Sequence, residues 1–173
     1  MGWWAAAVLA GLLGAGDGAS CPAELFRVGR STNANVVLYE ARLSAPGLLD
    51  GRDPVHPVWV MLAEDGRREE LNLVERALAY GVEVLARAGV SEAVIALRAS
   101  PGTPIRVVVE SGCPVARVPI GGREASLRRL HVEASGGPFP QVHWVDLVGM
   151  DPATGEEVRE RLAADDRSPW QEP

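Results

Sequence analysis

The chain has 173 residues, 47% of them hydrophobic, and a formal net charge of −6. This length and composition are typical of a single domain with a substantial core. The negative charge and the scattered basic residues argue against a nucleic-acid partner. All 17 basic residues are arginine, which excludes a lysine Schiff base, a phosphate-loop lysine and a lysine general base.

Residues 1–20 have the pattern of a secretory signal peptide. An apolar run from Trp3 to Leu13 is followed by small residues that end in Gly18-Ala19-Ser20, as at a cleavage site. The alternative is a buried N-terminal helix, because no basic side chain precedes the apolar run. We expect export to the periplasm or the cell envelope, with membrane contact only through the signal peptide or a lipid anchor.

The two cysteines leave several alternatives open. Cys21 directly follows the small residues, at the position where a bacterial lipoprotein is lipidated. In an oxidising compartment it would instead pair with Cys113 in a disulfide, or it would remain free. Two cysteines cannot form a metal cage, and His56, His131 and His143 have no ligand spacing. We therefore expect neither a metal ion nor a cofactor.

The first elements of the mature chain read as two strands. Leu25–Val28 is a short strand, and Val36–Leu43 is a longer one whose apolar residues alternate. The polar residues between them favour a turn. Residues 44–57 contain several Gly and Pro and read as a loop, in which Asp50 and Asp53 are turn residues and not metal ligands.

The stretch from Val58 to Gly81 combines a strand and a helix. Residues 58–63 carry no polar side chain, which predicts a central strand covered on both faces. Helical periodicity from Leu71 to Tyr80 predicts a short helix, 68–80, whose apolar side packs on the sheet. Gly81 would end it with a positive φ. The competing interpretation is a tight turn at Asp65-Gly66, with residues 67–73 pairing back as a strand.

The second half of the chain reads as strands and turns. We predict strands at 82–86, 93–97, 105–110, 115–120 and 141–150, with Gly121-Gly122 as a hairpin turn. The apolar parity changes between Leu127 and Leu130, which predicts a β-bulge near Arg128-Arg129. Residues 156–162 are either an edge strand or a short helix, and the polar tail 165–173 is expected to be disordered.

These elements predict a mainly β fold with one short α-helix. Residues 21–164 would form a single β-rich domain, an antiparallel barrel or sandwich with helix 68–80 packed on the sheet. A parallel α/β fold is not expected, because it would need several crossover helices and the sequence shows one.

Four separated motifs give the chain a family resemblance that covers nearly all of the mature sequence. It resembles the bacterial family catalogued as domain of unknown function 4833, which implies an exported or envelope-associated single domain and brings no known activity with it. Met150 departs from the pattern, where Thr is expected. The motifs, in order, are Leu25-Phe26 with Arg30-Ser31, Asn33-Ala34-Asn35-Val36-Val37 and Tyr39; Val58-Trp59 with Leu62-Ala63-Glu64, Gly66 and Arg68; Ala79-Tyr80-Gly81; and Val145-Asp146-Leu147 with Gly149, before Ala153-Thr154-Gly155-Glu156.

The densest polar cluster, formed by Arg30, Ser31, Asn33 and Asn35, is a candidate recognition loop. In it an arginine would supply a fork for a carboxylate or phosphate, and asparagine amides would orient the ligand. The alternative is an Asx-type turn whose arginine pairs with a structural carboxylate. Three aromatic side chains, Trp59, Tyr80 and Trp144, are assigned to the core. The candidate ligand-binding residues are Arg30, Ser31, Asn33, Asn35, Tyr39 and Asp146.

Two functional hypotheses follow from the sequence. The first is a noncatalytic envelope module that binds a small ligand or an envelope protein, and it assigns no catalytic residue. The second is a hydrolase-like enzyme that uses Arg30, Asp146 and a glutamate such as Glu64 or Glu75. Convergence of these side chains in one pocket, with a shifted carboxyl pKa, would favour the enzyme.

Overall fold

The computed structural model describes residues 21–136 and 141–163, which form one continuous sheet, a small separate hairpin and a short helical segment. The predicted signal peptide (1–20) and disordered tail (165–173) lie outside the described residues. The elements are β1 (Glu24–Arg30), β2 (Asn33–Ala41), β3 (Leu43–Ala45), β4 (Leu48–Leu49), β5 (Val55–Val60), β6 (Arg68–Glu70), α1 (Leu73–Glu75), η1 (Arg76–Tyr80), β7 (Val82–Arg87), β8 (Glu92–Leu97), β9 (Ser100–Glu110), β10 (Cys113–Ile120), β11 (Arg123–Ala134), β12 (Val142–Met150) and β13 (Glu157–Ala163).

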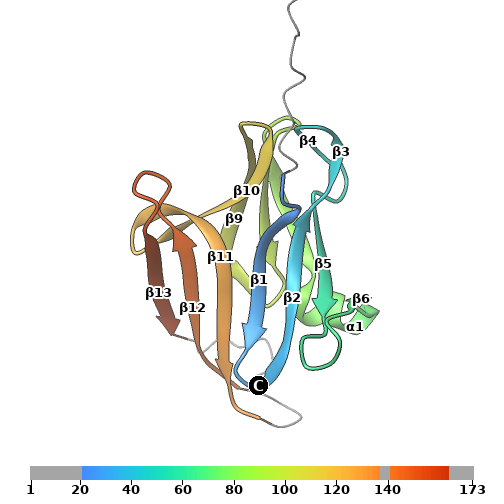
Figure 1. Ribbon diagram of the computed structural model, residues 1–173, viewed down its shortest axis with the longest axis vertical. Coiled ribbons are helices and arrows are strands. Elements are labelled where there is room, and N and C mark those ends of the chain that lie inside the picture. The colour runs from blue at the N-terminus through green and yellow to red at the C-terminus, as the bar shows by residue number, and fades with distance from the viewer. Residues whose placement is uncertain (1–20, 137–140, 164–173) are drawn as a thin grey trace, which may run out of the picture.

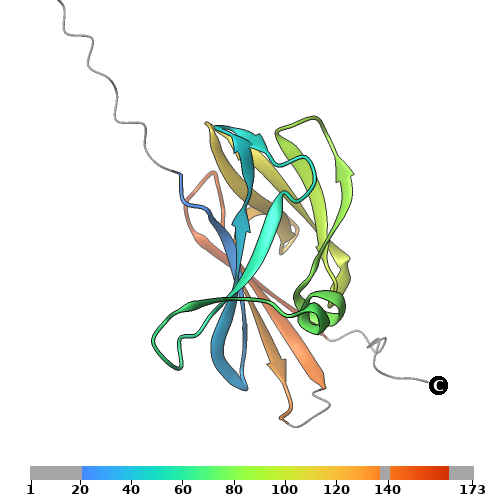
Figure 2. The same ribbon diagram turned by 90° about the vertical axis from the view of Figure 1, so that its right-hand side faces the viewer.

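Strand β11 is the branch point of the sheet (Figure 1). Along one edge its first residues pair with β10, and its later residues pair with β1. The opposite edge carries β12, which in turn pairs with β13. Two lobes, β1-β2-β5-β6 and β10-β9-β8-β7, therefore diverge from the same edge of one strand. Figure 2 shows the two lobes curling toward each other into a half-barrel.

The core fills the space between these lobes. Phe26 and Tyr39 come from the first lobe and Ile95 and Ile105 from the second, and each of them is at most 1% exposed. The rings of Phe26 and Tyr39 are stacked, with centroids 4.6 Å apart. The apolar alternation along the strands thus supplies one continuous inner face, as expected for a sheet that is wetted only on its outside.

The predicted mainly β fold is confirmed, with one correction. The sheet is mixed, because β1 and β11 run parallel to each other. A parallel pair that is adjacent along the chain needs a crossover connection. Here most of the other strands separate β1 from β11 along the chain, so no crossover helix is needed.

Two local predictions from the second half of the chain are confirmed. The β11–β12 pairing shifts register between Leu127 and Arg129, which places the extra residue, Arg128, where the parity change predicted a bulge. Gly121 and Gly122 connect β10 to β11 with φ values of 60° and 76°, as a two-residue hairpin turn requires. The segment 156–162, left open between strand and helix, lies almost entirely in the edge strand β13 (Glu157–Ala163).

The predicted helix 68–80 is too long. Residues 68–70 form strand β6 and pair with β5, as in the competing hairpin interpretation. The helical segment begins after Asn72, whose side chain accepts a hydrogen bond from the Glu75 amide, while the Glu75 carboxylate accepts one from the Asn72 amide. This capping box satisfies two amides that would otherwise lack partners.

The apolar side of this helical segment does not pack on a sheet face. Leu73 is 85% exposed, and Val74 and Leu78 are also exposed. The segment lies at one end of the two lobes (Figure 2), and among its residues only Tyr80 is buried. No helix in the described part of the chain has the length and apolar character needed to cross a membrane.

Two further details of this region differ from the sequence prediction. Gly81 has φ −64°, so it is not a left-handed cap. It is required because a Cβ atom there would lie 1.9 Å from the Arg76 carbonyl oxygen. The strand predicted at 58–63 is β5, which ends at Val60 and is the second strand from one end of the sheet, next to the short β6.

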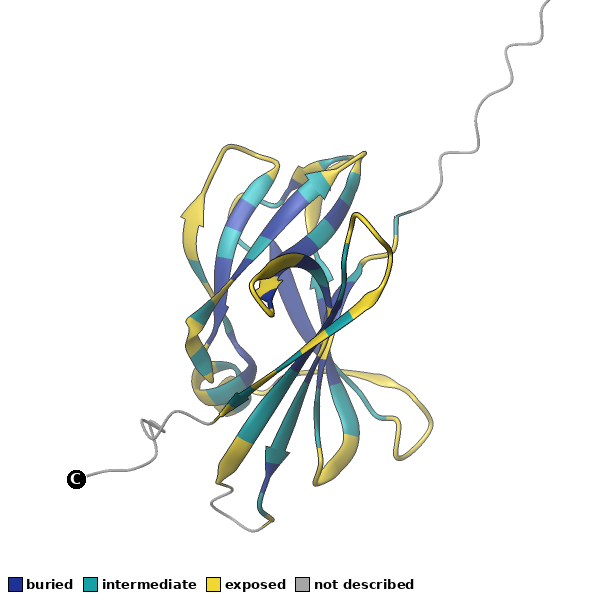
Figure 3. Cartoon of the chain, turned by 90° about the vertical axis from the view of Figure 1, so that its left-hand side faces the viewer, coloured by how far each residue is buried: buried dark blue, intermediate teal, exposed yellow. Residues whose placement is uncertain are grey.

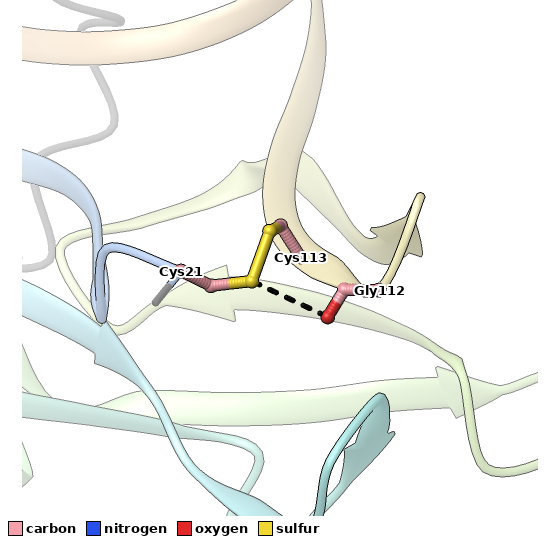
Figure 4. Close-up of a disulfide and its surroundings, with 3 residues drawn as sticks. All are labelled: Cys21, Gly112 and Cys113. Atoms are coloured by element: carbon pink, nitrogen blue, oxygen red, sulfur yellow. Dashed lines mark hydrogen bonds between the residues drawn. A yellow bond between two sulfur atoms is a disulfide. The ribbon is translucent and has the colours of Figure 1, made fainter. Parts of the chain in front are cut away.

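A disulfide joins the first described residue to the β9–β10 hairpin (Figure 4). Cys21 and Cys113 are bonded, with Cα atoms 5.3 Å apart and a sequence separation of 92. The Sγ atom of Cys21 also lies 3.5 Å from the Gly112 carbonyl oxygen, but a disulfide sulfur has no proton to donate. Of the alternatives for Cys21, the structure therefore shows the disulfide with Cys113. In this form the Cys21 sulfur is not available for a lipid.

Candidate functional site

Arg30 ends β1 on the inner face of the sheet. Its Cα partners are Asn33 on β2 and Val132 on β11. The guanidinium carbon lies 4.9 Å from the centroid of the Tyr80 ring, within the range of a cation–π interaction. Trp59 meets the same ring edge-on, with centroids 5.1 Å apart. Arg30 therefore faces an aromatic wall.

The other polar residues of the predicted recognition loop bind the backbone. The Ser31 hydroxyl accepts a hydrogen bond from the Ala134 amide at 3.2 Å. Asn33 accepts one from the Asn35 amide, and Asn35 accepts one from the Ala63 amide, each at 2.9 Å. These bonds fasten the β1–β2 turn to β11 and to the loop after β5. Only the Asn33 bond has the local spacing of an Asx-type turn; Ser31 and Asn35 bind amides that are distant in the sequence.

Tyr39 lies in the core and not at the predicted ligand surface. Its side chain has no exposed area, and its hydroxyl donates a hydrogen bond to the Tyr80 carbonyl oxygen at 3.0 Å. Burial raises the pKa of Tyr39 far above its ordinary value. The residue joins β2 to the end of the helical segment and so fixes the position of the ring that Arg30 covers.

Asp146 is bound to a neighbouring arginine on the outer face. Both carboxylate oxygens accept hydrogen bonds from Arg161 on β13, at 2.7 and 2.9 Å. These bonds lower the pKa of Asp146. The Arg161 guanidinium also lies over the Trp144 ring, 4.7 Å from its centroid, so Trp144 belongs to this surface as well.

The residues of the hydrolase hypothesis do not come together. Arg30 is paired with Val132, and Val132 with Val145, so these three side chains share the inner face. Asp146 is the next residue along β12 and points to the outer face, because successive side chains of a strand alternate. Glu64 is paired with an arginine of its own turn, and Glu75 forms the helix cap.

The carboxyl groups with shifted pKa values all shift in the same direction. Among the described residues, hydrogen bonds or arginine partners lower the pKa of Asp50, Asp65, Glu70, Glu110 and Asp146. A lowered pKa keeps a carboxylate ionised at neutral pH. It is the opposite of the shift that a general acid requires.

Shallow hollows on the outer face are formed by two groups of strands. The first, of about 330 Å³, is on β2, β5 and β6 and includes His56, whose Nε2 lies 2.9 Å from a Glu70 carboxylate oxygen. The buried Nδ1 of the same ring has no hydrogen-bond partner among the described residues. The second hollow, of about 460 Å³, is on β11, β12 and β13, and Asp146 is one of its lining residues. Within residues 21–136 and 141–163, no three His, Cys, Asp or Glu side chains are placed to hold a metal ion.

The sequence pattern missed several residues of these surfaces. Tyr80 and Trp59 were correctly assigned to the core, which Tyr80 joins and Trp59 packs against, but the sequence did not show that their rings also form a wall beside Arg30. Arg129 and Arg161 were not singled out, because the sequence has many dispersed arginines and no motif marks these two. Their shared face follows from strand alternation only when the bulge at Arg128 and the pairing of β11 with β12 and β13 are known.

The comparisons with known proteins give one match. A family model described as a domain of unknown function (DUF4833) matches residues 26–161, which is most of the chain. No curated protein and no solved structure has significant similarity to this chain. The family match supports the resemblance found in the sequence.

Proposed function

This chain belongs to the family of the domain of unknown function DUF4833, and from that premise we propose that it is an exported, noncatalytic domain that binds a small anionic ligand at Arg30. The ligand is a molecule with a carboxylate or phosphate group and a flat apolar body. The anionic group binds the guanidinium, and the body lies beside Tyr80 and Trp59.

The proposal depends on which groups contact the Arg30 guanidinium. Four arginines of the described residues are mostly buried: Arg30, Arg76, Arg106 and Arg117. Each of the last three forms an ion pair with a glutamate. Among the described residues Arg30 has no carboxylate partner, and its guanidinium contacts an aromatic ring instead.

An unpaired, partly buried cation is unfavourable unless something compensates its lost hydration. A cation–π contact contributes only ~0.5–2 kcal/mol and uses none of the five guanidinium N–H donors. A carboxylate or phosphate would accept two of these bonds in the bidentate geometry that arginine favours. An anionic ligand would therefore supply the negative charge and the hydrogen-bond acceptors that the described residues around Arg30 do not provide.

The noncatalytic character of the proposal follows from the neighbours of Arg30. Asp146, the proposed acid–base partner of the enzyme hypothesis, lies on the other face of the sheet. Tyr80 is held in the wall and has its pKa raised by burial, so it remains a neutral phenol at physiological pH. Beside the guanidinium, these groups favour binding over proton transfer.

Export is supported by the disulfide and the N-terminal sequence. Disulfides persist in oxidising compartments such as the periplasm, and Cys21–Cys113 lies just after the predicted signal peptide. We place the domain in the periplasm or the cell envelope. Its partner there is a small ligand or an envelope protein, and its contact with the membrane is confined to the signal peptide, because the disulfide leaves no Cys21 thiol for a lipid anchor.

The binding proposal is tested by titrating the isotope-labelled protein with inorganic phosphate, acetate and benzoate. The Nε–Hε resonance of Arg30 should move and saturate, and benzoate should bind more tightly than acetate because its ring can contact Tyr80 and Trp59. R30Q should abolish the saturable response, whereas R52Q, which removes an exposed arginine, should preserve it. The proposal fails if none of the anions gives a saturable shift, or if R30Q responds like the unchanged protein.

A further inference from the structure

The outer face of β11, β12 and β13 carries two rungs of charged side chains. Arg129, Val148 and Arg159 are Cα partners across the three strands, and so are His131, Asp146 and Arg161. Residues paired in this way point to the same side of the sheet. Six of the seven residues that line the 460 Å³ hollow belong to these rungs, and Glu160 is the seventh. Figure 3 faces this side of the molecule and shows the alternating exposure of β13.

The first rung places two arginines on either side of an apolar centre. Arg129 and Arg159 lie two strand spacings apart, about 10 Å between their Cα atoms. Val148 between them is only 4% exposed, because neighbouring side chains cover it, and its cross-strand neighbours on this face are the aliphatic stems of the two arginines. The guanidinium groups can therefore extend over the hollow as a pair.

The carboxylates of the hollow already have hydrogen-bond donors. Asp146 accepts both of its short bonds from Arg161, and Glu160 accepts one from the Gly121 amide at 2.7 Å. Arg129 has no carboxylate partner among the described residues, and Arg159 bonds to the exposed Glu157 through one side of its fork, with Nε at 2.6 Å. The hollow thus offers guanidinium donors in a chain whose net charge is −6.

We infer that this hollow binds an acidic polysaccharide lying across β11, β12 and β13, with Arg129 and Arg159 each holding a carboxylate of the glycan. The open, flat rungs suit an extended chain with spaced charges better than a small enclosed molecule. Asp146 retains lone pairs that can accept bonds from sugar hydroxyls. Its carboxylate, and the negative charge of the whole chain, would repel a densely charged polyphosphate. The site is separate from Arg30, which lies on the inner face.

The test measures binding of polygalacturonate fragments to the full chain by calorimetry, with dextran as the neutral probe and a short DNA duplex as the phosphate polyanion. The unchanged protein should bind polygalacturonate, and R129Q/R159Q should weaken that binding by about tenfold or more, because each change removes a charge-assisted hydrogen bond. The matched control R52Q/R87Q removes the same charge from exposed arginines elsewhere and should change the affinity by less than about twofold.

Three results would overturn the inference. One is that polygalacturonate does not bind, and the second is that the control double variant loses as much affinity as R129Q/R159Q. The third is that dextran or DNA binds as well as the acidic glycan. Thermal unfolding of both double variants shows whether they fold. R30Q separates this site from the proposed function, because it should leave polygalacturonate binding unchanged while abolishing the Arg30 response to benzoate.

Discussion

The molecule can be compared at the two ends of β1: the fastened end, which the Cys21–Cys113 disulfide crosslinks, and the open end, where β1 ends at Arg30. Each end contains an arginine that is at least partly buried. At the fastened end the Cys21–Cys113 disulfide joins the N-terminus to the β9–β10 hairpin. In the same hairpin Arg117 donates hydrogen bonds to both carboxylate oxygens of Glu110 and, at 2.7 Å, to the Ser126 hydroxyl. At the open end, beside the helical segment, the Arg30 guanidinium contacts the Tyr80 ring. Among the described residues it has no carboxylate partner.

The difference distinguishes a structural arginine from one that is available to a ligand. Arg117 is 8% exposed, and its guanidinium donates to Glu110 and Ser126 on the two neighbouring strands, β9 and β11. Arg30 is only partly buried, its guanidinium contacts the Tyr80 ring, and it has no carboxylate partner among the described residues. Substitutions at the two ends should therefore have opposite consequences for stability and for binding.

The largest effect is expected from the disulfide. C21S/C113S should lower the free energy of unfolding by ~2–5 kcal/mol, because the crosslink closes a long loop and restricts the unfolded chain. Chemical denaturation under non-reducing conditions measures this change. The Arg30 response to benzoate should persist in the double serine variant, since the disulfide is at the other end of β1. Loss of that response in a folded variant would show that the two ends are not independent.

The next largest effect is expected at Arg117. R117Q should destabilise the protein by ~1–3 kcal/mol, because it breaks a partly buried hydrogen-bonded ion pair and leaves Glu110 without its donor. Denaturant unfolding of R117Q beside R30Q gives the comparison directly. R30Q should cost less than about 1 kcal/mol, the strength of a partly exposed cation–π contact. Equal losses in the two variants would make Arg30 a structural residue.

The pH dependence of stability should also differ between the two ends. The hydrogen bonds from Arg117 lower the pKa of Glu110 in the folded state. Such a group adds stability above the unfolded glutamate pKa of about 4.3, and this stability is lost as the pH falls through the lowered folded value. The loss is modest because the Glu110 side chain is 43% exposed. Acid unfolding curves should be flatter for R117Q than for the unchanged protein and unaltered by R30Q.

The smallest effect is expected on the exposed side of the helical segment. Leu73 has almost no buried surface, so L73Q should change the free energy of unfolding by no more than about 0.5 kcal/mol. Y80A, in the same segment, removes the ring that supports Arg30 and should cost several-fold more. Thermal unfolding of the two variants compares them. A large loss in L73Q would mean that the apolar side of the helix is buried after all, as its periodicity predicted.

The sequence predicted those features that depend on local periodicity. The parity change at Leu127 and Leu130 gave the bulge, because side-chain alternation tolerates no other solution, and Gly121-Gly122 gave the hairpin turn. The helix was predicted too long because its periodicity is read without the cross-strand partners that hold residues 68–70 as a strand. Arg68 pairs with Glu40, and Glu70 with His56.

The candidate site depends on pairings that no local pattern contains. The sequence placed Arg30 in the densest polar cluster, but its position on the inner face follows from the parallel pairing of β1 with β11. The same pairing separates it from Asp146. Ser31 and Asn35 have the composition of a binding loop, and whether their groups face a ligand or a backbone amide depends on where β11 and the loop after β5 lie.

A crystal structure of the full chain grown with benzoate tests the central claim most directly. We predict a benzoate carboxylate within hydrogen-bonding distance of the Arg30 guanidinium, with its ring against Tyr80 or Trp59. An Arg30 that is instead paired with a carboxylate of its own chain, with no benzoate beside it, would contradict the account.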